Sequence, residues 1–155
     1  MPPEAQYDPL RAHENIWRAR EPPPADPSPP LTPAERRRLS FPALPWLDAA
    51  LARLPSTTLK ILAFMPVHIA AQPAPGTRAA EVESECKARI ASIAREHGAK
   101  VIDWRIASAL TRNDANYWDE LHYRVPIATR LAQEIAAAAL SGREAENGTY
   151  VRLVN

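Results

Sequence analysis

Asp119 and His122, the ends of an Asp-Glu-Leu-His block, are the residues whose types and spacing best suit acid–base chemistry. An Asp three residues before a His lets the carboxylate accept the proton on imidazole Nδ1 within a single turn. That contact fixes the tautomer and leaves Nε2 as a general base, as in the rear half of a hydrolytic triad. Two interpretations stay open: a catalytic dyad, or an Asp119 that caps the next helix beside an interfacial His122.

Other residues with chemical potential are few. His68 lies in the segment 66–76, after an apolar run, and is interpreted either as a substrate contact or as an ordinary loop residue. We expect no metal site, because His68, His122 and Asp119 lack the spacing typical of metal ligands. No cofactor is indicated. Cys86 is the only cysteine, which excludes an internal disulfide, and its place among apolar helical positions predicts a buried side chain.

Apolar patterning predicts the elements that position these residues. Short runs that are apolar on both faces predict strands over 59–65 and 99–104, each covered by helices. Helical spacing predicts helices over 47–54, about 77–97 and about 126–140. The tail 149–154 could add an edge strand.

Each of the two longer helices has a predicted buried stripe. In the helix from residue 77 the stripe consists of Val82, Cys86, Ile90, Ile93 and His97. In the last helix the inward residues are Ala128, Leu131, Ala132, Ile135 and Ala139.

The order of the elements predicts an α/β fold. Strands joined by a crossover helix run parallel, with a right-handed connection. Ligands of open parallel sheets bind beyond the carboxyl ends of the strands, where the segment 66–76 and the Asp119–His122 block should lie. We therefore expect part of a doubly wound parallel sheet. Two strands are few for such a sheet, so further sequence or a partner is implied.

Proline divides the chain into three predicted parts. Ten of the 17 prolines fall within the first 33 residues, where we expect no compact fold. Residues 1–44 are predicted to form a poorly ordered arm with short helices, one of them begun by Thr32, Pro33 and Glu35. Residues 45–142 form the predicted α/β domain, and 143–155 the tail.

Composition limits the partners and the compartment. The formal charge of +1 provides no field for a nucleic-acid backbone, and we expect no nucleic-acid partner. The longest apolar stretch, 61–67, is too short to span a membrane. No secretory signal is visible at the start, so the chain as written is expected in the cytoplasm, whereas a full-length relative could be exported or membrane-anchored.

The block NYWDELHYRVPIATRLAQEI, residues 116–135, resembles the Asp-x-x-His block that precedes the last helix of SGNH, or GDSL-type, hydrolases. LKILAFMPVH and AKVIDW also resemble segments of the branch related to alginate acetylation and D-alanine transfer. The resemblance covers about 45–140. It implies a three-layer α/β/α fold and an ester hydrolase or O-acyl transferase in which Asp119 orients His122. An acylated carbohydrate or small ester would be the substrate.

The blocks that supply the family's other catalytic groups are missing. The chain has no Gly-Asp-Ser block for the nucleophile, and Asn113-Asp114 does not follow a Gly as the oxyanion block would. The expectation is therefore the C-terminal part of such a domain, with the general-base dyad and no activity alone. The alternative is a noncatalytic interaction module whose open sheet edge pairs with a partner chain or a second copy.

Overall fold

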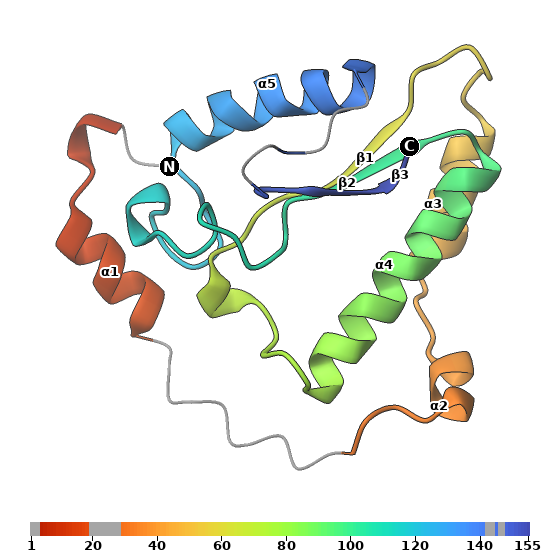
Figure 1. The fold of residues 1–155 in the computed structure, drawn as a ribbon, viewed down its shortest axis with the longest axis horizontal. Coiled ribbons are helices and arrows are strands. Elements are labelled where there is room, and N and C mark those ends of the chain that lie inside the picture. Colours follow the sequence, from red (N-terminus) through yellow and green to blue (C-terminus); the bar gives the residue numbers. More distant parts are fainter. Residues whose placement is uncertain (1–3, 19–28, 142–144, 146–147) are drawn as a thin grey trace.

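A three-stranded sheet in the order β1–β2–β3 lies at the centre of the protein (Figure 1). This computed structural model describes residues 4–18, 29–141, 145 and 148–155. β1 (Ile61–Phe64) and β2 (Lys100–Asp103) are parallel neighbours, with Ala63 opposite Ile102. The prediction of two adjacent parallel strands is therefore confirmed, and the protein belongs to the α/β class.

The third strand makes the sheet mixed rather than wholly parallel. β3 (Val151–Val154) forms at the predicted edge position but runs antiparallel to β2. The residue before it, Tyr150, packs its ring 5.1 Å from that of Trp104, which directly follows β2. The chain thus enters β3 from the carboxyl end of β2 and must run back along it. The expectation of a parallel sheet is corrected in this respect.

Helices cover both faces of the sheet. On one face Ile102 packs with Leu131 of α5 (Val125–Ser141) and with Trp104. On the other face Val101 packs with Ala94 of α4 (Arg78–Glu96) and Leu51 of α3 (Leu44–Ala52). Because successive strand residues point to opposite faces, the helices bury the apolar side chains of β2 on both faces of the sheet.

Local sequence signals set the helix ends. The Thr77 hydroxyl accepts a hydrogen bond from Ala80 N at the start of α4, and Gly98, with φ +62°, follows its end. In α2 (Pro33–Arg38) the Thr32 and Glu35 side chains each accept a hydrogen bond from the other's backbone N–H, as the capping box predicts. None of the helices in the described part of the chain is long and apolar enough to cross a membrane.

The predicted helix stripes are partly wrong. In α4 the fully buried residues are Ala91 and Ala94, and Cys86 is only half-buried. In α5, Leu131 and Ala139 are buried as expected and Ile135 is half-buried against the core. Ala128 and Ala132 are exposed instead, and Ile127 and Ala138 are buried although the stripe did not include them. Small side chains face the sheet where the backbones approach closely, and periodicity alone does not show which face that is.

The N-terminal region takes part in the core within the residues described. α1 (Pro9–Trp17) begins at Asp8, whose carboxylate accepts hydrogen bonds from Leu10 N and Arg11 N. Ile16 is 1% exposed and belongs to the same cluster as Ile102. For 4–18 the expectation of no compact fold is therefore wrong, because the residues of α1 that face the core are apolar. Most of the proline run 21–30 lies outside the described residues, and the division into arm, domain and tail stays a prediction.

Candidate functional site

The Asp119–His122 block forms a turn between β2 and α5. Trp118 N donates to the His122 carbonyl over 2.8 Å, and Tyr117 forms an isolated antiparallel bridge with Tyr123. A further hydrogen bond of 2.8 Å, from His68 N to the Glu120 carbonyl, joins this turn to the segment after β1. The turn therefore lies where the parallel-sheet rule places a ligand, beyond the carboxyl ends of β1 and β2.

Asp119 contacts the imidazole of His122 directly. His122 Nδ1 lies 2.8 Å from Asp119 Oδ1 and 2.9 Å from Oδ2. Asp119 Oδ1 also accepts hydrogen bonds from the backbone N–H groups of Leu121 and His122, each over 2.9 Å. One carboxylate thus closes the turn and orients the ring. Asp119 does not cap α5, because neither backbone N–H belongs to that helix.

This contact determines what the imidazole can do. The carboxylate requires a proton on Nδ1, which leaves the lone pair on Nε2. No residue in the described part of the chain bonds Nε2, and the His122 side chain is 56% exposed. Burial raises the pKa of Asp119, but the hydrogen bonds from Leu121 and His122 outweigh it and hold that pKa below its ordinary value. Asp119 is therefore ionised at neutral pH, and Nε2 is an accessible proton acceptor.

His68 is fully buried and is held at both ring nitrogens. Nδ1 accepts a hydrogen bond from Ala70 N over 3.0 Å at the start of η2 (Ile69–Ala71), so the proton sits on Nε2. Nε2 lies 3.0 Å from Asp114 Oδ1. The ring also stacks edge-on against Tyr117, with ring centroids 5.3 Å apart. His68 thus supports the segment after β1 from inside, and a substrate contact for it stays a prediction that this burial does not favour.

Asp114 joins three parts of the chain through one carboxylate. Asp114 is the first residue of η3 (Asp114–Asn116). Its Oδ2 accepts a hydrogen bond from Trp17 Nε1 over 2.9 Å and contacts His13 Nδ1, and its Oδ1 contacts His68 Nε2. Burial raises the pKa of Asp114, and the bonds from Trp17 and His13 more than offset this and lower it. The sequence carries no signal for this cluster, because His13 and Asp114 are 101 residues apart.

A second set of contacts holds the N-terminal segment against the turn. Glu4, in η1 (Glu4–Gln6), accepts hydrogen bonds from Arg124 and from Val125 N, at the start of α5. The Arg124 guanidinium also lies over the Tyr7 ring, 3.5 Å from its centroid, and Tyr7 packs edge-on against Trp118 at 5.2 Å. Residues 4–17 therefore fix both ends of the turn that carries the dyad.

No nucleophile accompanies the dyad in the described part of the chain. No serine hydroxyl there bonds His122. Ser108 is the serine nearest to His122 in sequence, and it is buried and contacts Thr111. Within the same residues, no group of three or more His, Cys, Asp or Glu side chains is arranged to hold a metal ion.

Comparisons with models of protein families, with curated proteins and with solved structures found no match for this chain. The Asp-x-x-His resemblance therefore rests on the residues quoted above and on the geometry of the turn.

Proposed function

We propose that this chain provides the general-base side of an SGNH-type ester-hydrolase or O-acyl-transferase site. The observation that carries the proposal is the Asp119 carboxylate on His122 Nδ1, with Nε2 accessible beyond the carboxyl ends of two parallel strands. The same resemblance implies a larger three-layer α/β/α domain, in which further parallel strands continue the sheet beyond β1.

In this proposal His122 works with a serine supplied by a separate polypeptide segment. Nε2 takes the serine proton as the hydroxyl attacks the ester carbonyl, and the imidazolium is stabilised by Asp119. Collapse of the tetrahedral intermediate breaks the ester bond, and His122 returns the proton to the leaving alcohol. Water, or an acceptor alcohol in a transferase, then attacks the acyl-serine by the same steps. An acylated carbohydrate or small ester is the proposed substrate class.

The isolated chain should have no esterase activity. A base without a positioned serine and oxyanion donors can neither form nor stabilise an acyl-enzyme. The test therefore adds the serine-bearing half of an SGNH hydrolase and follows release of p-nitrophenol from p-nitrophenyl acetate. Activity should exceed the sum of the separate parts.

Variants assign that activity to the dyad. His122→Ala should lower the recovered rate by about 10²- to 10⁴-fold, the usual contribution of general-base catalysis. Asp119→Asn should lower it as well, because the amide cannot hold the same tautomer. His97→Ala, at the C-terminal end of α4, is the matched control and should leave the rate unchanged. Equal rates with and without His122, or no gain on mixing, would reject the proposal.

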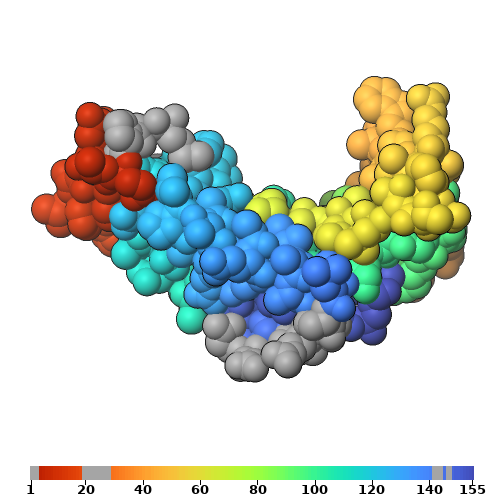
Figure 2. Space-filling view, turned by 90° about the horizontal axis from the view of Figure 1, so that it is seen from above, coloured from red at the N-terminus to blue at the C-terminus, as the bar shows by residue number. Residues whose placement is uncertain are grey.

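A second candidate function is a noncatalytic module that completes the sheet of a partner. β1 pairs only with β2 among the described strands, so alternate backbone N–H and C=O groups face outward along its free edge. Figure 2 shows the surface hollowed above β1, between the lobe of residues 44–60 and the lobe that contains α1 and the start of α5. A partner that protects the amides of 61–64 from exchange, with equal affinity for His122→Ala, would favour this function.

A further inference from the structure

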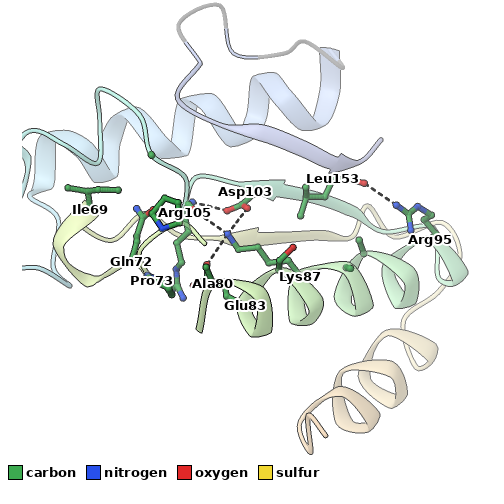
Figure 3. A pocket seen from close by; sticks show the side chains of 15 residues that line it. Ile69, Gln72, Pro73, Ala80, Glu83, Lys87, Arg95, Asp103, Arg105 and Leu153 are labelled. Carbon is green, nitrogen blue, oxygen red and sulfur yellow. Dashed lines mark hydrogen bonds and ion pairs between the residues drawn. The ribbon is translucent and has the colours of Figure 1, made fainter. Parts of the chain in front are cut away.

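A cavity of about 600 Å³ lies between α4 and the segment after β1, on the face of the sheet opposite to α5 (Figure 3). Its polar side chains come from the end of β2 and the residues just after it, from one face of α4 and, in Gln72, from the segment after β1. Tyr123, next to His122, packs instead in the core on the α5 side. The cavity is thus separate from the Asp119–His122 dyad, although both are near the carboxyl ends of the parallel strands.

Lys87 neutralises the acidic residues of the cavity. Its ammonium group bonds Asp103 Oδ2 over 2.8 Å, Glu83 Oε1 over 3.0 Å and the Arg105 carbonyl over 2.8 Å. An ammonium has three donors, so all of them are used within the protein. Asp103 is almost fully buried and accepts a further hydrogen bond from Arg105 N. Lys87 therefore has no donor left for a ligand, and the charge of Asp103 is already paired.

Arg105 is the cation that remains. Its Nε atom is buried and makes no hydrogen bond, and the described part of the chain offers no acceptor to the rest of its guanidinium. A buried guanidinium donor without an acceptor costs roughly 1 to 3 kcal/mol or more. The simplest explanation for the position of Arg105 is therefore an acceptor that a ligand supplies. Arg95 also lines the cavity, and among the residues that the structure describes its side chain bonds only the Leu153 carbonyl, over 3.4 Å. The lining therefore carries more positive than negative charge.

Most of the remaining wall is apolar. It is made by Ile69, Pro73, Pro75, Ala80, Ala107 and Leu153. A volume of about 600 Å³ is within the usual range for small-molecule sites, which combine an apolar wall with a few polar groups that fix orientation. The planar fork of a guanidinium matches a carboxylate with two parallel hydrogen bonds.

We propose that this cavity binds a small carboxylic acid, whose carboxylate pairs with Arg105 and whose hydrocarbon part lies between Ile69, Pro73 and Leu153. Arg105 directly follows Trp104 at the end of β2, and strand alternation puts it on the same face as Asp103. The backbone of β2 thus fixes the position of the anchor. The site is independent of the proposed hydrolase function.

Hexanoate is a suitable probe, and hexanamide is its neutral counterpart of nearly equal shape. In amide-detected NMR titrations of the full chain, hexanoate should cause saturable shifts at Ile69, Arg105 and Ala107, and hexanamide should not. Arg105→Gln should weaken hexanoate binding by about 10- to 100-fold, which corresponds to the loss of a charge-assisted pair. Arg112→Gln, at an exposed position outside the cavity, is the matched control and should bind as the wild type does.

A further variant keeps the test decisive if Arg105→Gln does not fold. Arg105→Lys retains the charge but loses the planar guanidinium fork. This variant should bind hexanoate more weakly than the wild type does, but more tightly than it binds hexanamide. Equal shifts with hexanoate and hexanamide, undiminished binding by Arg105→Gln or Arg105→Lys, or no saturable shift at millimolar hexanoate would each overturn the proposal. Binding of inorganic phosphate with none of hexanoate would also overturn it, in favour of a phosphate site.

Discussion

The Glu4 carboxylate bonds the Arg124 guanidinium from 120 residues away, with Arg124 Nε at 3.0 Å and Nη2 at 2.8 Å from Glu4 Oε2. Glu4 Oε1 also accepts from Val125 N, so one acidic side chain fixes the residues between the His122 turn and α5. The hydrogen bonds from Arg124 lower the pKa of Glu4, and the pair stays charged at neutral pH. The orientation of the dyad therefore depends on a segment far from it in sequence.

Glu4→Gln should loosen this turn without unfolding the sheet. The amide has one acceptor oxygen and no charge, so it cannot satisfy both Arg124 and Val125 N. Amide exchange at 118–124 should become several-fold faster, while exchange in β1 and β2 stays unchanged. The ¹⁵N signals of His122 should show a smaller population of the Nδ1–H tautomer.

The control for this change is Glu14→Gln, which removes the solvent-exposed ion pair between Glu14 and Arg18 on α1. Surface ion pairs of this kind contribute little to stability. Amide exchange at 118–124 and the tautomer population of His122 should therefore both match the wild type. A Glu4→Gln protein with unchanged exchange at 118–124 and an unchanged His122 tautomer would contradict a positioning role for Glu4.

Asp114→Asn should destabilise the protein in a pH-dependent way. Asn keeps the size of the side chain, but its single carbonyl oxygen cannot accept from Trp17, His13 and His68 together. Because Asp114 is partly exposed, we expect the free energy of unfolding to fall by about 1 kcal/mol at pH 7.

The pH dependence of this loss follows from the lowered pKa of Asp114. A carboxyl group whose pKa is lower in the folded state adds stability above its unfolded pKa, about 4, and loses it as the pH falls through the folded value. The difference between wild type and Asp114→Asn in urea unfolding should therefore shrink below about pH 4. Asp8→Asn, which keeps a good N-cap, is the control. A difference that stays constant from pH 7 to pH 3 would be inconsistent with this account.

The parts of this structure that depend on residues close together in the sequence could be predicted from it. β1, β2 and α4 lie where apolar runs and caps place them, and the capping box of Thr32 and Glu35 forms as its spacing indicates. The contact between Asp119 and His122 is of the same kind, because three residues of one turn bring the two groups together. Local geometry was sufficient in each case.

Contacts between distant segments could not be predicted. Asp114 meets His13, Trp17 and His68 only because α1 packs beside η3, and nothing in the pattern around Asp114 indicates that packing. The burial of Ile16 depends on the same contact. The proline content indicated a poorly ordered N-terminal arm with short helices. Packing of α1 against the core was not predicted, because α1 buries only Ala12 and Ile16.

Ile16→Ala tests whether α1 belongs to the core in solution. Ile16 is 1% exposed, and its truncation leaves a cavity in the core cluster that also contains Trp104 and Tyr117. We expect the free energy of unfolding to fall by about 2 to 4 kcal/mol. Leu10→Ala, on the same helix but 77% exposed, should change it by less than about 0.5 kcal/mol. Equal small effects of the two substitutions in chemical denaturation would show that α1 is not packed.

Lys87→Met tests the buried polar network between α4 and β2. The substitution keeps most of the apolar stem of Lys87 but leaves the Asp103 side chain, which is 3% exposed, with only its hydrogen bond from Arg105 N. Removing one partner of a buried ion pair leaves an uncompensated charge, so the free energy of unfolding should fall by about 3 kcal/mol at pH 7.

The sign of the pH dependence of Lys87→Met separates this cause from lost packing. Burial raises the pKa of Asp103 above its ordinary value, although Lys87 partly offsets this, so ionised Asp103 costs the folded state stability above the unfolded pKa. Without Lys87 that cost grows, whereas protonated Asp103 needs no cation. The stability difference from the wild type should therefore narrow as the pH falls toward about 4. The double variant Lys87→Met/Asp103→Asn should recover most of the loss at pH 7, and a double variant no more stable than Lys87→Met would mean that packing, and not charge, holds α4 on β2.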